Sequence, residues 1–383
     1  MPPLFGKRSR QSLGVRLTTY CETCSRPKEP LSLIDNSPQM RDNQDNSMAH
    51  TITRTHLDQL VGRLLSTDKS VIGLTEANGR HFFQRIDAVP TMVLDSVIMS
   101  SNSIKEFFFP KSEAICSYRH EGKNLIVTDA DPLAQEQVIF GVRPCDVASL
   151  PILDKVFAWD YQDRFYQQRR SLSTIVSLAC KEADKSCFCT SVGLAPDTQS
   201  GADAMLLQIS ADTFEVRLFT EKGTALFRGQ TEESDKVGKT AVPPKVKFDA
   251  KRVADYLREN FVDSTFDHTS LRCVGCGGCT YVCPTCHCFD IVDEGGASKG
   301  KRVKNWDTCQ FAMFSLHASG HNPRSDQSAR QRNRVQHKFN IYPEKFGAIL
   351  CTGCGNCTRV CSASLGILPV LELLDEKAQS ATN

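Results

Sequence analysis

The stretch RCVGCGGCTYVCPTCHCFD, residues 272–290, decides how this sequence is interpreted. Its first three cysteines, Cys273, Cys276 and Cys279, are each separated by two residues. Cys283 follows after three more residues and directly precedes a proline. This C-x₂-C-x₂-C-x₃-C-P spacing is typical of 4Fe–4S binding, where three thiolates bind one cluster and the fourth cysteine binds another. The interleaved glycines allow positive φ and bring N–H groups close to the sulfides.

The cysteine spacing recurs near the C-terminus in CTGCGNCTRVC, residues 351–361. Two such runs predict a module with two clusters, in which each fourth cysteine crosses to the other cluster. The first cluster is then bound by Cys273, Cys276, Cys279 and Cys361, and the second by Cys351, Cys354, Cys357 and Cys283.

Length and composition limit the class of protein. A chain of 383 residues is long enough for two or three domains, and no apolar run approaches the length of a membrane span. The 18 cysteines cluster in metal-ligand spacings without a secretory signal, which favours the reducing cytoplasm over a disulfide scaffold. A formal net charge of +2 gives no indication of a nucleic-acid partner.

We expect an α+β fold in three parts. Residues 1–50 are polar and lack periodicity, which predicts a disordered leader. Cys21 and Cys24 form an isolated C-x₂-C there, and translation could start at Met1 or at Met48. Residues 51–247 read as an α/β domain, and residues 248–383 as a mainly helical dicluster ferredoxin domain.

Periodicity predicts the main elements of both domains. The expected strands are 70–75, 91–99, 124–128, 137–142, 174–180 and 204–210. The expected helices are 56–66, 249–261, 309–319 and 328–340. No G-x-G-x-x-G or P-loop motif is present, so the sequence indicates no nucleotide site.

Two further sets of cysteines have open roles. Cys145, Cys180, Cys187 and Cys189 would converge at one sheet edge if the strands before Cys145 and Cys180 were neighbours. They then form a third metal site, or they are structural thiols. Cys286, Cys288 and Cys309 form an additional site, a redox pair or packing beside the clusters.

The segment 324–338 is strongly basic and carries Arg330, Arg334 and Lys338 at helical spacing. Three interpretations are open: charge balance for anionic clusters, a docking face for an acidic partner, and an ordinary solvated helix.

The motifs resemble a known family. CPTCHCFDIVDE, followed by RVKNWDTC and a basic stretch before the second cysteine run, is similar to the iron–sulfur subunit of anaerobic sulfite reductase. It is equally similar to the beta subunit of soluble nickel–iron hydrogenases, the sulfhydrogenases. Upstream, FFFPKSE, GVRPCD and CFCTSVG extend the resemblance, which covers about Thr51 to Leu368. Ser362 departs from the pattern, because it replaces the usual proline after Cys361.

The resemblance implies a cytoplasmic electron-transfer component of a larger complex, one that is not catalytic alone. Its expected partners are a catalytic redox subunit of the sulfite reductase or hydrogenase type and a flavin-containing NAD(P)H diaphorase subunit. The alternatives are a self-contained iron–sulfur oxidoreductase with a flavin or substrate site in the N-terminal domain, and a zinc-stabilised binding module. Zinc ribbons use two separated C-x₂-C pairs, however, and this chain has two tight triplets. Electron donor, acceptor, direction and cluster potentials stay open.

Overall fold

The computed structural model describes residues 49–94, 100–131 and 135–382. The expected leader lies outside these residues except for positions 49 and 50, which begin the first strand. Cys21, Cys24 and both candidate start methionines are therefore not described.

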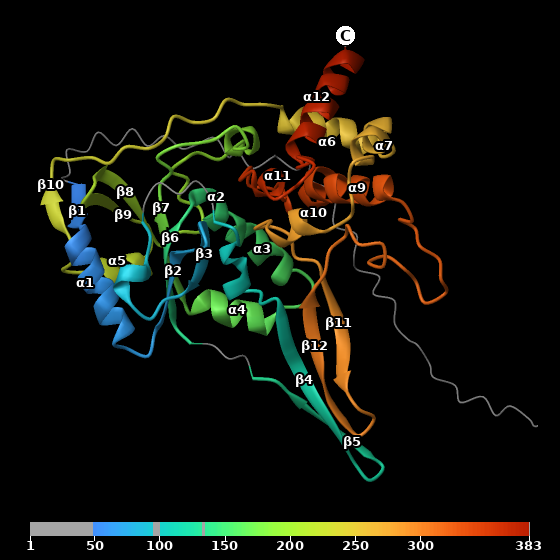
Figure 1. Cartoon of the computed structure of the whole chain (residues 1–383), viewed down its shortest axis with the longest axis horizontal. Coiled ribbons are helices and arrows are strands. Elements are labelled where there is room, and N and C mark those ends of the chain that lie inside the picture. The colour runs from blue at the N-terminus through green and yellow to red at the C-terminus, as the bar shows by residue number, and fades with distance from the viewer. Residues whose placement is uncertain (1–48, 95–99, 132–134, 383) are drawn as a thin grey trace, which may run out of the picture. The chain divides into compact units, whose positions relative to one another are not determined.

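An eight-stranded sheet forms the centre of the N-terminal part (Figure 1). Its strands, in spatial order, are β10 (Glu232–Ser234), β1 (Ala49–Thr53), β9 (Thr213–Leu218), β8 (Ala204–Ser210), β7 (Ser173–Leu178), β6 (Gln137–Val142), β2 (Ser70–Ala77) and β3 (Arg80–Arg85). β8, β7, β6 and β2 pair in parallel, and the outer pairs are antiparallel. Parallel strands are covered on both faces, which explains why every residue of β6 is buried.

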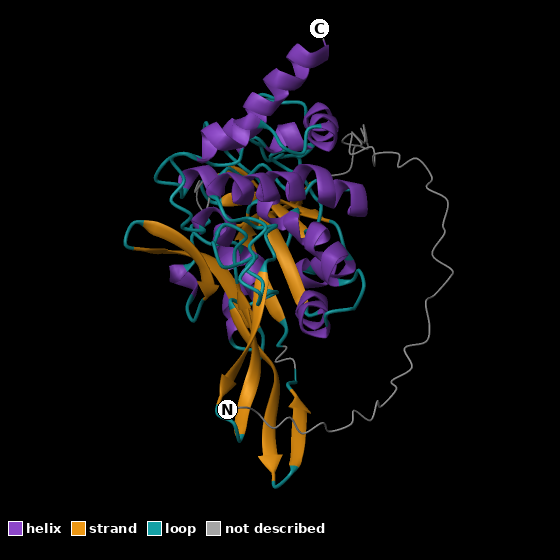
Figure 2. Ribbon diagram, turned by 90° about the vertical axis from the view of Figure 1, so that its right-hand side faces the viewer, coloured by secondary structure: helices purple, strands orange, loops and turns teal. Residues whose placement is uncertain are grey.

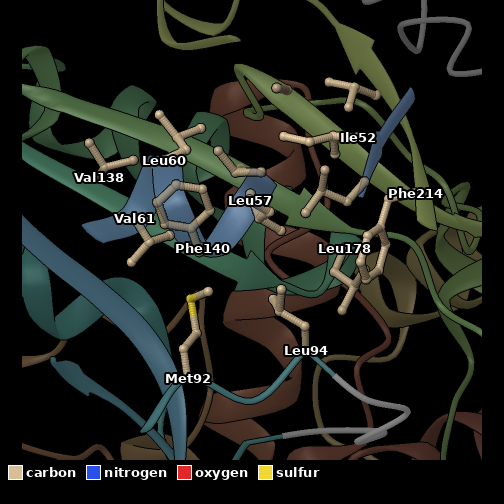
Figure 3. Close-up of a cluster of buried hydrophobic side chains, with 14 of the residues drawn as sticks. Ile52, Leu57, Leu60, Val61, Met92, Leu94, Val138, Phe140, Leu178 and Phe214 are labelled. Atoms are coloured by element: carbon tan, nitrogen blue, oxygen red, sulfur yellow. The ribbon is translucent and has the colours of Figure 1, made fainter. Parts of the chain in front are cut away.

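Helices cover both faces of this sheet. Val138 and Phe140 of β6 pack on one face with α1 (Arg54–Leu65) and α5 (Glu221–Phe227) (Figure 3). The intervening Ile139 faces the opposite core, formed with α2 (Pro144–Val147), α3 (Ser149–Phe157) and α4 (Arg164–Ser171). Alternate residues of a strand point to opposite faces, so one apolar run fills two cores.

A second, four-stranded antiparallel sheet has the order β11 (Phe289–Gly295), β12 (Lys299–Trp306), β4 (Ser112–Glu121) and β5 (Asn124–Asp129). Figures 1 and 2 show it extending away from the helices. The buried Lys304 of β12 lies 3.5 Å from an oxygen of Glu113 on the neighbouring β4 and 2.9 Å from an oxygen of Asp163, the residue that caps α4, so it ties the sheet to that helix. Strands from both sides of the expected boundary at 247 and 248 thus share one sheet.

The helices of the C-terminal part pack around a core that also includes Phe188 and Val192 of the N-terminal part. They are α6 (Ala250–Glu259), α7 (Ser264–Ser270), α8 (Gly278–Tyr281), α9 (Gln327–Gln336), a π-helix (His337–Ile341), α10 (Tyr342–Phe346), α11 (Asn356–Arg359) and α12 (Leu368–Thr382). The mainly helical description is not confirmed, because β11 and β12 also belong to this part. Among the described helices, none combines the length and apolar character needed to cross a membrane.

Two expected elements are wrong. Residues 309–319 form turns instead of a helix, and their apolar side chains Phe311, Met313 and Leu316 stay exposed. A helix of this length needs packing of its apolar face, which this segment lacks. Residues 91–94 are not a strand: Thr91 ends a 3₁₀ turn (Val89–Thr91) that contains Pro90, which cannot donate to a ladder, and residues 92–94 have no regular structure. The remaining residues of that expected strand, 95–99, are not described.

The parallel sheet yields a stability prediction. Leu206→Ala truncates a side chain of β8 that is 0% exposed, and should lower the free energy of unfolding by about 2–5 kcal/mol through lost burial and a residual cavity. Leu125→Ala on β5, where the side chain is 55% exposed, should change it by less than about 0.5 kcal/mol. Urea denaturation of both variants under anaerobic conditions measures the difference, and equal midpoints would contradict the described core.

Candidate iron–sulfur centre

Both cysteine runs adopt the same local structure. In the first run Gly275 and Gly277 have φ of 68° and 73°, and a short helix, α8, follows. In the second run Gly353 and Gly355 have φ of 64° and 77°, and α11 follows. These left-handed positions favour glycine, and they turn the chain so that successive cysteines can face one centre.

Thiols from both runs line one pocket. Its wall includes the four cysteines predicted for the second cluster, which are Cys283, Cys351, Cys354 and Cys357. The fourth cysteine of the first run therefore lies with the triplet of the second run, as the predicted crossing requires. Burial raises the pKa of Cys351 to about 12, so the thiolate form needs compensating positive charge.

The first predicted set, Cys273, Cys276, Cys279 and Cys361, lies where α8 and α11 pack together. A Cβ placed on Gly278 would lie 3.8 Å both from Cys276 Sγ and from a methyl group of Val360, the residue before Cys361. Gln327 Nε2 donates to Cys273 Sγ at 3.2 Å, and the backbone N–H of Leu365 donates to Cys361 Sγ at 3.3 Å. Such donors favour the thiolate form of a ligand.

The residues that the structure describes contain no group of three or more Cys, His, Asp or Glu side chains suited to a single metal ion. The ligands of a 4Fe–4S cube bind four different irons, so they lie further apart than the ligands of one ion. The finding bears on mononuclear sites, whereas the four thiols that line the pocket come from two separate cysteine runs.

Three buried cations surround the thiols, namely Lys105, Arg334 and Lys338, with exposed fractions of 2%, 5% and 2%. None of them has a carboxylate partner within 4.0 Å among the described residues. Lys338 Nζ instead contacts Cys283 Sγ at 3.4 Å, and Lys105 Nζ donates to the Cys286 carbonyl at 2.8 Å. Burial lowers the pKa of Lys105, and a buried charge needs an opposite charge nearby, so an anionic centre would favour the charged form of these three side chains.

Arg334 illustrates this requirement. Burial lowers the pKa of Arg334. The neighbouring thiols, led by Cys279 and Cys357, together raise it by more than burial lowers it, so the net shift is upward. Its Nε has no hydrogen-bond partner in the described part of the chain. Lys338 responds in the same way: its thiol neighbours, led by Cys283, outweigh burial and raise its pKa.

The basic segment 324–338 is therefore not a plain solvated helix. Arg334 and Lys338 point into the interior, which makes the docking interpretation wrong for these two residues. Arg330 is half-buried, and its guanidinium binds Gln327 and the carbonyl groups of Arg324 and Ser325. The structure favours charge balance among the three interpretations.

The four cysteines of the N-terminal part lie near the pocket that the second ligand set lines. β6 and β7, the strands before Cys145 and Cys180, are parallel neighbours, as their convergence requires. Burial raises the pKa of Cys145, and the thiols of Cys354 and Cys180 raise it further. Burial also raises the pKa of Cys189 to about 11, with contributions from Cys180 and Cys187. The four thiols thus influence one another and a residue of the second run.

The segment carrying Cys187 and Cys189 packs tightly on the second run. Phe188 N donates to the carbonyl of Gly353 at 2.9 Å, and a Cβ on Gly353 would lie 2.5 Å from Cys189 Cα. Arg359, which follows Cys357 by two residues, is 2.6 Å from Asp184 and 3.2 Å from Cys187 Sγ. Only glycine at 353 permits this approach.

The remaining three cysteines, Cys286, Cys288 and Cys309, form two pairs of neighbouring thiols that include one proposed ligand, Cys283. The Cys286 thiol contacts that of Cys283, and the Cys288 thiol contacts that of Cys309. The Asp307 N–H donates to the Cys288 carbonyl at 3.0 Å, so the base of the β11–β12 hairpin brings the second pair together. Their roles stay open.

Sequence reasoning missed Lys105. It lies on a 3₁₀ turn (Ile104–Phe107), and its ammonium group is 4.2 Å from the Trp306 ring centroid and close to the thiols of Cys286 and Cys283. A single lysine 168 positions before Cys273 has no motif around it, so no local signal marks it.

Comparisons with known proteins agree with this geometry. Residues 272–365 match the family model described as "4Fe-4S dicluster domain", a range that contains all eight predicted ligands. The chain is 29% identical over 319 residues to "Sulfhydrogenase 2 subunit beta" of Pyrococcus furiosus, covering 80% of this chain and 92% of that protein. No solved structure matches. The chain is thus an iron–sulfur protein with a 4Fe–4S dicluster domain and a relative of a sulfhydrogenase beta subunit, as its motifs predict.

Proposed function

We propose that this chain is the electron-transfer subunit of a cytoplasmic multi-subunit oxidoreductase. It relays electrons between two partners, a catalytic redox subunit of the hydrogenase or sulfite reductase type and a flavin-containing NAD(P)H diaphorase subunit. The name of its relative, a sulfhydrogenase subunit, supports a place in such a complex. The observation that carries the proposal is the pocket lined by thiols from both cysteine runs.

The proposed ligands follow the crossed arrangement. Cys273, Cys276, Cys279 and Cys361 hold the first cluster, and Cys283, Cys351, Cys354 and Cys357 hold the second. When bound, the clusters supply one-electron redox chemistry. N–H groups support the thiolates directly: Ile367 N donates to Cys357 Sγ at 3.4 Å, and Leu365 N donates to Cys361 Sγ at 3.3 Å.

The buried cations set the charge of the centre. Lys338 and Arg334 stand beside the thiols of the second set, and Lys105 reaches the same region from the N-terminal part. Positive charge close to a cluster stabilises its reduced form, which carries one more negative charge, and so raises its reduction potential. We therefore assign these three residues to charge compensation.

A third iron–sulfur cluster at Cys145, Cys180, Cys187 and Cys189 extends the proposal. The electrostatic contact between Cys145 and Cys354 supports it, because it brings this set next to the second one. Burial also raises the pKa of Cys180, and Arg143 lowers it. A cation is therefore present at this set too.

Iron content and spectroscopy test the ligand assignment. Anaerobically purified protein should contain about eight iron and eight sulfide atoms, or about twelve of each with a third cluster. Cys283→Ser should perturb the EPR signal of the second cluster, although it belongs to the first run. The matched Cys361→Ser should perturb the first. Four iron atoms or fewer in fully reconstituted protein would contradict two clusters, and the opposite pattern of signals would contradict the crossing.

Charge compensation predicts a change in potential. Lys338→Met removes a buried positive charge 3.4 Å from Cys283 Sγ and should make the midpoint potential of one cluster more negative. We expect up to about 100 mV, or about 2 kcal/mol for one electron. Lys251→Met on α6, where the side chain is 66% exposed, should leave both potentials unchanged. EPR-monitored redox titration makes the comparison, and identical potentials in the two variants would refute the assignment.

Dependence on a partner separates the proposal from a self-contained oxidoreductase. The isolated chain should be reduced by dithionite but should not oxidise NAD(P)H until a flavoprotein subunit is added. Absorbance at 340 nm, with and without that subunit, gives the answer. Catalytic NAD(P)H oxidation by the flavin-free chain would favour the alternative, in which the N-terminal domain holds a substrate or flavin site.

A further inference from the structure

The two proposed ligand sets differ in depth. Cys276 of the first set is exposed, whereas the other seven proposed ligands are buried or half-buried. In the second set Cys283, Cys354 and Cys357 are all buried. Electron tunnelling weakens steeply with distance, so the surface at Cys276 is a short route between this chain and another molecule.

Exposed apolar side chains occur on three chain segments that include or approach Cys276 and its neighbours Gly277 and Gly278. We call them the apolar collar: Leu271, Val274, Phe311, Met313 and Val360, with exposed fractions of 81%, 82%, 36%, 71% and 46%. A Cβ on Gly277 would lie 3.0 Å from the Phe311 ring, and one on Gly278 would lie 3.8 Å from Val360 and from Cys276 Sγ. The collar thus comes from three separate segments that meet at one cluster ligand.

The loop that contributes Phe311 and Met313 carries no charged residue, whereas the exposed Arg272 lies between Leu271 and Val274 in the chain. Residues 308–323 contain no Asp, Glu, Lys or Arg, and they form an open loop between β12 and α9 (Figure 1). Met313 and Leu316 remain exposed there although the loop runs along the first ligand set. A contiguous exposed apolar surface marks an interaction site, and the centres of such interfaces are depleted in charge.

We propose that the apolar collar docks the flavoprotein partner, which brings the edge of its flavin to Cys276. This inference rests on the proposed function and adds the face at which that partner binds. The dimethylbenzene edge of a flavin carries no charge, so it loses little hydration against the collar, whereas a charged face would remain unpaired there. In the direction of NAD(P)H oxidation, the flavoprotein loses two electrons and two protons. The two clusters accept one electron each, and the protons go to water.

The test uses the complex with its co-expressed flavoprotein subunit. Met313→Glu and Leu271→Glu place a carboxylate in the collar, on separate segments and away from the ligand positions. Each should slow NADPH-driven appearance of the reduced-cluster EPR signal at least tenfold, while iron content and reduction by dithionite stay unchanged. Val237→Glu, at a side chain that is 59% exposed beside β10 at the far edge of the eight-stranded sheet, is the matched control and should behave as the unmodified complex.

Other results would overturn the inference. One is an NADPH-driven rate in both collar variants equal to that of Val237→Glu. Another is that the collar variants lose the catalytic subunit instead of the flavoprotein on size exclusion. A third is loss of iron from both collar variants, which would make the collar a structural element. A coupling rate in the unmodified complex that falls strongly between low and high salt would also overturn it, because salt screens charge contacts and not apolar ones. An unmodified chain without iron would instead refute the proposed function.

Discussion

Three buried positive charges without carboxylate partners constrain everything around the cysteines. An ammonium or guanidinium group in a protein interior is unfavourable unless an anion lies close by. Lys105, Arg334 and Lys338 meet thiols, carbonyl oxygens and an aromatic ring instead of Asp or Glu. The fold therefore commits part of its interior to an anionic prosthetic group. The 4Fe–4S clusters of the proposed arrangement, each with four thiolates, would provide that charge.

The cysteine sets can be arranged by how deeply they are buried, from the surface of the molecule inward. The exposed Cys276 marks one end, the buried pocket of the second set lies further in, and Cys145 and Cys189 adjoin that pocket through Cys354 and Gly353. Lys338 and Lys105 lie at the inner set, Arg334 interacts with thiols of both sets, and the surface near Cys276 carries exposed apolar side chains together with Arg272. An apolar outer surface and a charge-compensated inner site suit electron exchange with another protein. The inner thiols then need not be exposed to water.

Spacing in the sequence predicted the local structure of the two cysteine runs, because the glycines that turn the chain lie between the cysteines themselves. The pairing of each triplet with the fourth cysteine of the other run stays a prediction. The parallel strands were equally readable, since β6 is buried on both faces and carries only one polar residue. What failed depended on distant partners. Residues 309–319 have helical periodicity but no surface to pack on, and β11 forms a sheet only by pairing with β12, which pairs with β4 far earlier in the chain. Lys105 reaches the cysteines only in the folded chain, so no window of sequence could reveal it.

The shared four-stranded sheet has a consequence for how such proteins can be recombined. A fragment that began at residue 248 would keep the cysteine runs but would leave the edge of β12 without β4, and it would lack Lys105. An isolated two-stranded hairpin is marginally stable and exposes a strand edge that invites aggregation. Residues 248–383 therefore cannot be exchanged between relatives as an independent domain. A functional chimera has to take β4, β5 and the turn that carries Lys105 from the same protein as the cysteine runs.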